Sequence, residues 1–390
     1  MKYVSILIVA ILFAFSPAGK KKEIAVKNLL TTERHEIVAI PLNKLKEIQS
    51  RDSKKQWIVK EKKSGEIVLS QVIDNKDAAV EELVFEVTLA SKEEKSFIIE
   101  ATDQVPSPDT KRSTYSRLVP ERIDDYAWEN DLVAFRTYGP EAQRLVDAKE
   151  KGGTLTSGMD CWLKRVNYPV IDKWYKKYVA GGSYHKDDQG EGYDPYHVGD
   201  SRGCGGIGVW KNDSLYVSKN FISYKKIAEG PVRNIFELTY APWQADGITI
   251  NETKRITIDL GNQMYKVEDK IKANGTLPNI TIGVTLHDKK GKVQADQGKG
   301  WFSYWEPVDD SEIGTGIVID PKSLLQYEDY RTTKKDLSQL HIIVRPEAVI
   351  TYYPGFGWSK AGVITSPEAW SNYLGQFAQR ISSPLQVSYK

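Results

Sequence analysis

The chain of 390 residues is poor in the residues that build metal clusters and disulfide scaffolds. It contains only two cysteines, Cys161 and Cys204, together with three methionines and five histidines. Two cysteines exclude a disulfide-dense fold and a cysteine-rich zinc or iron–sulfur module. An excess of charge is also missing, because 54 Lys and Arg residues balance 52 Asp and Glu residues to leave +2. This balance argues against a dedicated nucleic-acid-binding protein, which usually carries a basic excess.

Long hydrophobic runs are scarce as well. The run at 4–15 is apolar apart from one serine, follows a positively charged start and precedes the small residues at 16–18. It is too short to span a bilayer, so we interpret residues 1–18 as a secretory signal peptide. We therefore expect an exported protein, periplasmic or extracellular, without a membrane span. In an oxidising compartment Cys161 and Cys204 can form one disulfide, which we favour slightly over two buried thiols.

Aromatic residues, in contrast, are abundant. They make up 11% of the chain and include ten Trp and 21 Tyr, a content that rules out a disordered chain. Such side chains fill β-sheet cores and also stack on sugars, so both uses stay open.

Apolar residues alternate with polar ones over most of the chain, which predicts β-strands. The alternation is clearest at 38–42, 85–89, 236–240, 256–260 and 280–286. Helices are predicted at 140–151, 169–178 and 367–377. A polar stretch with prolines at 106–116 predicts a linker between an N-terminal β domain, 23–105, and a larger domain, 117–390. We therefore predict an all-β fold whose large domain is an antiparallel β-sandwich.

The segment 183–206 concentrates polar chemistry. It holds six Gly, five acidic residues, three Tyr, two His and Arg202. So polar and glycine-rich a stretch can form neither a core strand nor a stable helix, and we predict a long functional loop. An ordered loop without a chemical role is the alternative.

Two motifs in this loop have other interpretations. Residues 199–203 match G-x-S-x-G, but a nucleophile elbow needs a following helix, which the glycines at 203–206 oppose. We therefore do not predict a serine hydrolase. Four loop residues are legitimate ligands for a divalent metal, although their spacing matches no standard zinc or calcium pattern: His185, Asp187, Asp188 and His197. We predict no cofactor and leave a metal in the loop open.

Acid–base chemistry on a sugar is the interpretation that we favour. His185 and His197 exchange protons near neutral pH, and Tyr196 can donate or accept one. Arg202 can bind a carboxylate with two parallel hydrogen bonds. Removal of the C5 proton of a uronic acid requires a base, a cation that neutralises the carboxylate, and an acid for the departing oxygen. The loop supplies all three.

Residues outside the catalytic set are candidates for substrate binding. We predict this role for Arg136, Lys164, Tyr184 and Trp301. Arg136 has an equally good alternative as the partner of a nearby carboxylate, and Trp301 can be a stacking platform or ordinary core. His287 ends a predicted strand on its polar side, where we expect a solvated side chain.

Four segments resemble a known family of secreted proteins from polysaccharide-degrading Bacteroidetes-type bacteria. They are VPERIDDYAWENDLVAFRTYGP (119–140), SGMDCWLKRVNYPVIDKWY (157–175), YHKDDQGEGYDPYHVGDSRGCGG (184–206) and GPVRNIFELTY (230–240). The family is grouped with the galactose-mutarotase-like β-supersandwiches, a fold that polysaccharide lyases and several glycosidases share. The resemblance extends over residues 25–385 and implies a polysaccharide-lyase-like β-supersandwich with a small N-terminal β-sandwich domain.

At least one activity in that family is the dehydration of oligosaccharides during ulvan breakdown. The resemblance implies a hydro-lyase that removes water from a non-reducing-end glucuronic or iduronic acid linked to sulfated rhamnose, which leaves a 4,5-unsaturated uronate. In this expectation Arg202, with Arg136 or Lys164, neutralises the carboxylate. One of the two loop histidines abstracts the C5 proton and Tyr196 protonates the departing hydroxyl, with the acid and base assignments exchangeable.

Two further functions remain alternatives. A polysaccharide lyase would cleave uronate-containing chains by β-elimination, with a sugar as the group departing from C4. A non-catalytic carbohydrate-binding protein would use Trp301, Trp305 and Trp358. In each case the expected partner is an anionic oligosaccharide rather than nucleic acid, and the sequence does not define the oligomeric state.

Overall fold

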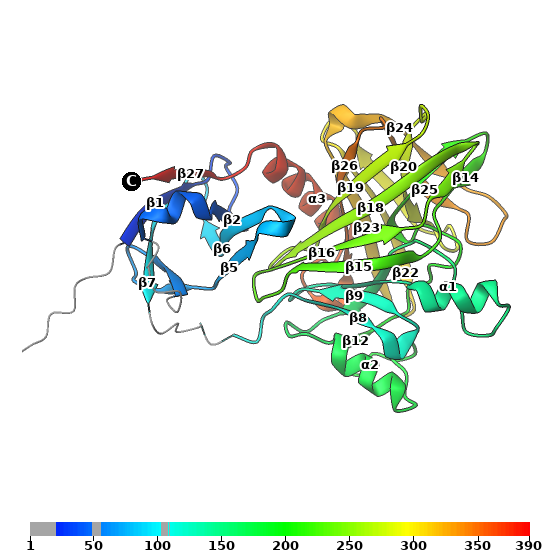
Figure 1. The fold of residues 1–390 in the computed structure, drawn as a ribbon, viewed down its shortest axis with the longest axis horizontal. Coiled ribbons are helices and arrows are strands. Elements are labelled where there is room, and N and C mark those ends of the chain that lie inside the picture. The colour runs from blue at the N-terminus through cyan, green and yellow to red at the C-terminus, as the bar shows by residue number, and fades with distance from the viewer. Residues whose placement is uncertain (1–20, 49–55, 103–107, 109) are drawn as a thin grey trace, which may run out of the picture.

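The computed structural model describes residues 21–48, 56–102, 108 and 110–390, which form two β-rich bodies side by side (Figure 1). The predicted signal peptide, 1–18, lies outside the described residues, as does part of the predicted linker. Within the described chain no helix is long and apolar enough to cross a membrane. The smaller body is N-terminal and the larger one carries most of the chain.

Two small antiparallel sheets form the N-terminal domain. One has the order β27-β1-β7-β3-β4 and the other the order β2-β6-β5. The elements are β1 (Lys21–Lys27), β2 (Arg34–Pro41), η1 (Leu42–Ile48), β3 (Gln56–Glu61), β4 (Ile67–Val68), β5 (Ser70–Asn75), η2 (Lys76–Ala78), β6 (Val80–Leu89), β7 (Glu94–Thr102) and β27 (Gln386–Tyr389). The predicted alternation at 85–89 is confirmed in β6, where Phe85, Val87 and Leu89 are buried.

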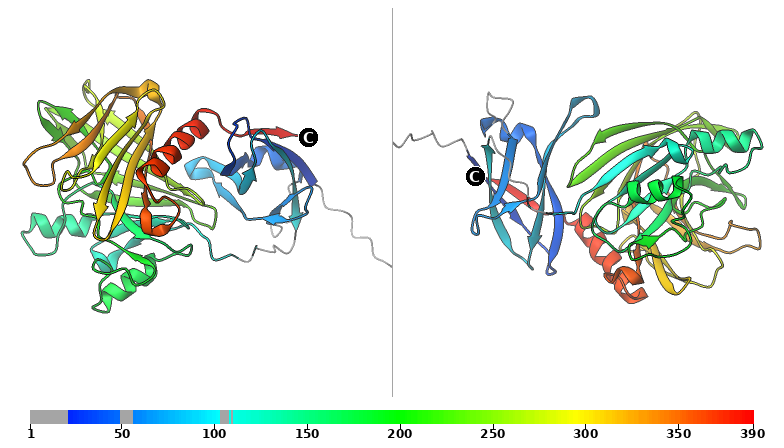
Figure 2. Two further views of the ribbon diagram at one scale, coloured as in Figure 1. Left: turned by 180° about the vertical axis from the view of Figure 1, so that it is seen from behind. Right: turned by 90° about the horizontal axis from the view of Figure 1, so that it is seen from below.

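The chain returns to this domain at its end. Strand β27 pairs antiparallel with β1, so residues 386–389 belong to the N-terminal sheet although we predicted a large domain of 117–390. Helix α3 (Pro367–Ser382) leads toward the smaller body and lies between the two bodies in all views (Figures 1 and 2).

Three antiparallel sheets build the large domain. Their orders are β15-β16-β18-β19-β26-β23-β22-β21 with β17 on β18, β14-β13-β20-β25-β24, and β12-β11-β10-β9-β8. One continuous buried cluster takes side chains from all three sheets. The all-β sandwich fold is thus confirmed, and alternating residues such as Ile280, Ile282 and Val284 on β20 fill its core.

The elements of the large domain follow the chain in this order: β8 (Tyr115–Val119), η3 (Pro120–Arg122), β9 (Asp125–Glu129), β10 (Ala134–Thr137), α1 (Pro140–Asp147), β11 (Asp160–Lys164), α2 (Ile171–Val179), β12 (Gly192–Tyr193), β13 (Cys204–Lys211), β14 (Ser214–Tyr216), β15 (Phe221–Ala228), β16 (Arg233–Tyr240), β17 (Trp243–Ala245), β18 (Ile248–Asp259), β19 (Lys266–Ala273), β20 (Ile280–Thr285), β21 (Lys292–Asp296), β22 (Trp301–Val308), β23 (Ser311–Ile319), η4 (Pro321–Ser323), β24 (Leu324–Tyr330), β25 (Gln339–Val344), β26 (Val349–Trp358) and η5 (Ser359–Ala361). Strand β8 begins inside the predicted linker, and α3 extends beyond the helix predicted at 367–377. Burial continues past the predicted end of the helix, because Ala378 as well as Phe377 packs in the cluster that α3 forms with the sandwich.

The two cysteines are buried, free thiols. The disulfide that we slightly favoured from the sequence is therefore not formed. Cys204 instead donates to the backbone oxygen of Gly355 at 3.3 Å, and burial raises the pKa of Cys161 well above its usual value.

Candidate active site

Arg136 lies at the centre of a buried ion cluster in the sheet β12-β11-β10-β9-β8. Its Nη2 is 3.0 Å from Asp194 Oδ2 and also binds Asp160, while Nη1 lies 3.7 Å from Asp125 Oδ2. Nη1 also donates to the Tyr184 hydroxyl at 3.1 Å. Adjacent strands bring these groups together, since Arg136 on β10 is paired in register with Asp160 on β11. The alternative in which Arg136 pairs with a carboxylate is confirmed, and there are three such carboxylates.

Burial raises the pKa values of two aspartates in this cluster. Loss of hydration raises the pKa of Asp125 to about 6 and that of Asp160 to about 7, although the charge of Arg136 opposes both changes. The charge of Asp194 also contributes to the raised pKa of Asp160. Because its pKa is about 7, Asp160 is partly protonated near neutral pH, which reduces the surplus of negative charge around Arg136.

His185 extends this cluster toward solvent. Its Nδ1 is 2.9 Å from Asp194 Oδ2 and 3.3 Å from the backbone oxygen of the same residue. The side chain is 37% exposed, and within the described residues no hydrogen bond is made by Nε2. A carboxylate held at one nitrogen orients the ring and leaves the other nitrogen available to take a proton from a ligand.

A cavity of about 480 Å³ opens in front of these residues. Arg136, Asp194 and His185 line it, and Tyr196 and His197 complete the wall from the glycine-rich loop. The segment 153–155 and the end of α1 supply less polar lining. This volume falls in the range of small-ligand sites, which often run from about 300 to 1,000 Å³. The predicted functional loop thus borders a cavity, and it is irregular between Ser183 and Glu191 and between Asp194 and Gly203.

Tyr196 is part of this wall and has a buried hydroxyl group. The side chain is buried, and its hydroxyl makes no hydrogen bond within the described residues. Burial raises the pKa of Tyr196 well above its usual value, so the group stays protonated and can donate.

His197 and His287 lie beside Tyr196 in different settings. His197 is 59% exposed at the rim, with Nε2 3.2 Å from Asp336 Oδ2. His287 is not the solvated side chain that we predicted: Nδ1 is 2.5 Å from Glu306 Oε1, and Nε2 donates to the backbone oxygen of His197 at 2.9 Å. The alternation at 280–286 correctly predicts where this strand ends, but no sequence signal pairs it with Glu306. His287 follows strand β20, whereas Glu306 lies on strand β22, and these two strands belong to different sheets.

Two predicted cations do not reach the cavity. Arg202 is buried in the core and donates to Ser157 Oγ at 2.8 Å and Thr156 Oγ1 at 3.2 Å; burial lowers its pKa to about 10. Lys164 is also buried, with Nζ 2.7 Å from Glu129 Oε2. Neither side chain lines the 480 Å³ cavity, so we assign neither a contact with substrate.

The predicted aromatic contacts are likewise core residues. Trp301 is half-buried against the cluster formed by α3, and Trp305 and Trp358 are buried. They form no exposed stacking platform. Tyr184 is buried, and its hydroxyl accepts the hydrogen bond from Arg136; its ring lies 4.2 Å from the ring of His185. Tyr184 lines a neighbouring cavity of about 550 Å³ with Trp174 and supports the candidate site from behind.

The structure also shows where the G-x-S-x-G match and the candidate metal ligands of the loop lie. Ser201 is buried and donates to the backbone oxygen of Val198 at 2.6 Å, and strand β13 rather than a helix follows it. The G-x-S-x-G match is thus no nucleophile elbow. In the part of the chain that the structure describes, no group of three or more His, Cys, Asp or Glu side chains is placed to hold a metal ion.

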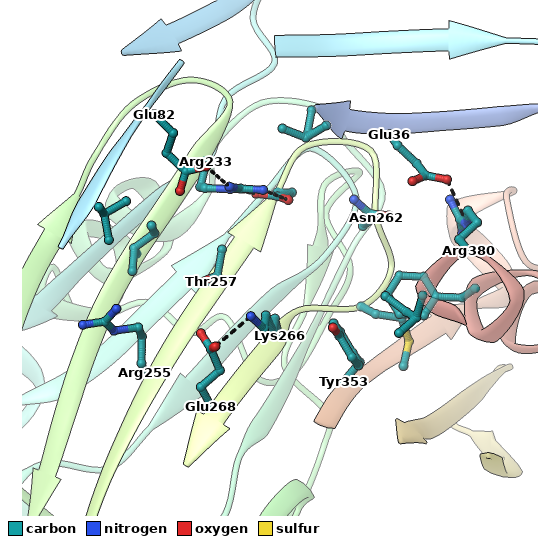
Figure 3. Close-up of a pocket in the computed structure, with 17 residues that line it drawn as sticks. Glu36, Glu82, Arg233, Arg255, Thr257, Asn262, Lys266, Glu268, Tyr353 and Arg380 are labelled. Atoms are coloured by element: carbon teal, nitrogen blue, oxygen red, sulfur yellow. Dashed lines mark hydrogen bonds and ion pairs between the residues drawn. The ribbon is translucent and has the colours of Figure 1, made fainter. Parts of the chain in front are cut away.

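A second hollow of about 350 Å³ lies between the two bodies (Figure 3). Its charged side chains engage one another across the domain boundary, because Arg233 Nη1 is 3.1 Å from Glu82 Oε2 and Arg380 Nε is 3.9 Å from Glu36 Oε1. We interpret this hollow as part of the contact between the domains.

Two solved structures have a fold similar to that of this chain. An alpha-mannosidase from Enterococcus faecalis V583 aligns with 95% of this chain and 46% of its own, with a TM-score of 0.53 and 10% identity. A protein in the glycosyl hydrolase family 38 from Enterococcus faecalis aligns over 95% and 47%, with the same TM-score and 11% identity. The chain thus spans about half the length of these two structures, and at this identity the similarity concerns the fold alone.

Sequence comparison shows the family. A relative from Formosa agariphila, named "Uncharacterized protein P7", is 38% identical over 397 residues that cover 100% of both chains. Residues 26–387, nearly all of both domains, match one family profile. The chain therefore belongs to the family described as Domain of unknown function (DUF4861).

Proposed function

We propose that this protein is a hydro-lyase that removes water from the non-reducing-end uronic acid of anionic, ulvan-type oligosaccharides. One observation carries the proposal: His185, held by Asp194 at Nδ1, and Tyr196, with an unengaged hydroxyl, line the same 480 Å³ cavity. A base with a free nitrogen and a donor that stays protonated are the two groups that an elimination needs.

The elimination assigns one proton to each group. His185 Nε2 takes the C5 proton, the electrons of the C5–H bond form the C4–C5 double bond, and the C4–O bond breaks. Tyr196 donates its hydroxyl proton to the departing oxygen, which leaves as water. The proton held by His185 then returns to the Tyr196 phenolate and resets the site. General acid–base catalysis of this kind contributes about 10² to 10⁴ in rate.

Charge stabilisation falls to Arg136 rather than to Arg202 or Lys164. Arg136 lines the cavity, whereas the other two cations are engaged elsewhere. The raised pKa values of Asp125 and Asp160 reduce the negative charge around Arg136 near neutral pH, which favours a contact between Arg136 and the uronate carboxyl, where charge develops.

The relatives are compatible with carbohydrate chemistry. The two similar structures are described as an alpha-mannosidase and a glycosyl hydrolase family 38 protein, so the fold occurs in carbohydrate-active enzymes. We extend this to a sugar substrate here, and the N-terminal run at 4–15 supports export to where polysaccharides are degraded.

The test is to incubate the protein with saturated uronate-terminated oligosaccharides and to follow ultraviolet absorbance and mass. Loss of one water with the chain intact, together with absorbance from the new double bond, is the expected result. Chain scission would instead identify a polysaccharide lyase. Retention of the sugar without reaction would identify a binding protein, and either of these results would overturn the proposal.

Variants of His185 and Tyr196, each with a matched control, test the roles of these two residues as base and acid. We expect His185→Ala and Tyr196→Phe each to lower kcat by about 10²-fold or more. His35→Gln, on β2 of the N-terminal domain, and Tyr265→Phe, another buried hydroxyl without a hydrogen bond within the described residues, should keep full activity. Full activity of His185→Ala would remove His185 from the mechanism.

A further inference from the structure

The turn after β20 holds a histidine that does not line the cavity but contacts two residues that do. His287 has a φ of 36°, in the left-handed region that residues other than glycine rarely adopt. Strained backbone of this kind persists where surrounding contacts hold it, and it often occurs at functional sites. The contacts of the side chain indicate what that role is.

Three interactions fix the His287 ring. Nδ1 lies 2.5 Å from Glu306 Oε1 on β22, and Nε2 donates to the backbone oxygen of His197 at 2.9 Å. The ring also stands nearly perpendicular to the ring of Tyr196, at 86°, with 4.6 Å between centroids. One side chain therefore joins the end of β20, strand β22 and the loop that carries Tyr196 and His197.

The hydrogen positions follow from the partners. A backbone carbonyl only accepts, so Nε2 must carry a hydrogen. Nδ1 faces a carboxyl oxygen, which places a second hydrogen between His287 and Glu306. Burial lowers the pKa of His287, but the hydrogen bond and the charge of Glu306, with a smaller contribution from Asp288, outweigh it and raise the pKa above its usual value.

Other groups face this pair from each element around it. Asp288 lies on the same turn, and Tyr304 on β22 lowers the pKa of Glu306 while burial raises it. Across the His197 backbone, the His197 ring binds Asp336. None of these groups replaces the hydrogen bond to the His197 carbonyl.

We propose that His287 and Glu306 form a positioning pair that holds Tyr196 and His197 in their reactive arrangement. This inference rests on the proposed function, because it gives the pair its purpose at that site. The Tyr196 hydroxyl has no hydrogen bond within the described residues, so the orientation of the ring depends on contacts such as that with His287. A displacement of about 1 Å in a reacting group can cost about 10²-fold in rate.

Substitutions of His287 that differ in which of its two hydrogen bonds they keep test this role. The amide nitrogen of Gln lies near the position of His Nε2, and that of Asn near His Nδ1. His287→Ala and His287→Asn lose the bond to the His197 carbonyl, so we expect kcat to fall by about 10²-fold with KM changed less than about threefold. His287→Gln keeps that bond, and we expect kcat within about tenfold of the wild-type value.

The matched control is His341→Ala. His341 is a buried histidine of the same sandwich whose ring nitrogens make no hydrogen bond within the described residues. This variant should lose stability through lost packing while kcat stays near the wild-type value. If His287→Ala is folded and keeps its kcat, or if His287→Gln is as impaired as His287→Ala, the pair has no positioning role.

A readout independent of turnover separates this inference from the proposed function. Long-range proton–nitrogen NMR should show hydrogens on both His287 nitrogens at neutral pH, with the second lost in Glu306→Gln. The carbonyl carbon signal of His197 should shift in His287→Ala and return toward its wild-type position in His287→Gln, which keeps the hydrogen bond. If the wild type dehydrates no uronate, the proposed function fails alone; a His197 carbonyl signal that is unchanged in His287→Ala, or that is not restored in His287→Gln, would overturn the positioning pair.

Discussion

Arg136 is surrounded by three aspartates, and at the scale of single residues this surplus of negative charge governs how the candidate site titrates. Asp160 is buried, and its Oδ1 has no hydrogen-bond partner within the described residues. Burial and the charge of Asp194 raise the pKa of Asp160 to about 7, although Arg136 opposes them. A buried carboxyl with this pKa is partly protonated near neutrality.

We predict that Asp160→Asn removes part of the pH dependence of stability. The pKa of Asp160 in the folded protein, about 7, lies above its ordinary value of 3.8, so the folded chain binds more protons between these pH values. The stabilising contribution is complete below about pH 4 and is lost as pH rises toward 7. The amide of Asn cannot ionise, so the variant should gain stability relative to wild type over this window, by about 1.4 kcal/mol per pKa unit.

Urea unfolding at several pH values between about 4 and 8 measures this difference. Asp200→Asn, an exposed residue at the cavity rim, is the control and should follow the wild-type curve. Parallel curves for Asp160→Asn and wild type would show that Asp160 has an ordinary pKa in the folded protein.

At the scale of elements, a buried carboxylate fixes the start of helix α2. The backbone N–H groups of Val170 and Ile171 donate to Glu129 Oε1 at 2.9 Å each, which satisfies donors that a helix leaves free at its first turn. The other oxygen of Glu129 lies 2.7 Å from Lys164 Nζ. Lys164 therefore helps to hold the wall of aromatic side chains behind the candidate site, and this role explains its burial.

We predict that Glu129→Gln is strongly destabilising. It leaves the ammonium group of Lys164 buried without a carboxylate, a change that costs about 3–5 kcal/mol. Chemical unfolding should show this loss, and Glu129→Gln/Lys164→Met should regain part of it because the uncompensated charge is gone. Glu121→Gln breaks an exposed ion pair with Arg117 and should cost less than about 1 kcal/mol. Equal stability of the two Gln variants would contradict the prediction.

At the scale of the whole molecule, the end of the chain ties the large sandwich to the N-terminal domain. Strand β27 extends the sheet of β1, and Leu385 and Val387 pack against the core of that domain. Arg34 on β2 adds a hydrogen bond of 2.7 Å from Nη1 to the backbone oxygen of Ser383. The N-terminal domain is thus completed by residues more than 350 positions away.

We predict that deletion of residues 386–390 selectively destabilises the N-terminal domain. Strand β1 becomes an exposed edge, and part of the apolar cover is lost. Calorimetry should show an earlier transition, shifted by about 4–8 °C per kcal/mol lost for a domain of this size, while the large sandwich melts as before. Gln386→Ala/Ser388→Ala keeps the backbone pairing and should melt like wild type. A single unshifted transition in the deletion variant would contradict this prediction.

Local patterns predicted much of this molecule. Alternation at 85–89, 236–240 and 280–286 predicted strands, and the glycine-rich composition of 183–206 predicted the loop that borders the cavity. These signals work because strand and loop preferences depend on neighbours a few residues away. The same locality explains why the sequence did not reveal that the cysteines are unpaired, that His287 binds Glu306, or that Arg202 is buried away from the cavity.

The sequence by itself determined the β-sandwich class and the loop that supplies His185 and Tyr196. Only the tertiary structure decided that Arg136 is shared by three aspartates, that Arg202 is buried away from the cavity, and that β27 returns to β1. The physical reason is that burial and pairing depend on which strands become neighbours across hundreds of residues. Side-chain periodicity defines the faces of each strand, whereas the packing of three sheets selects the partners that those faces meet.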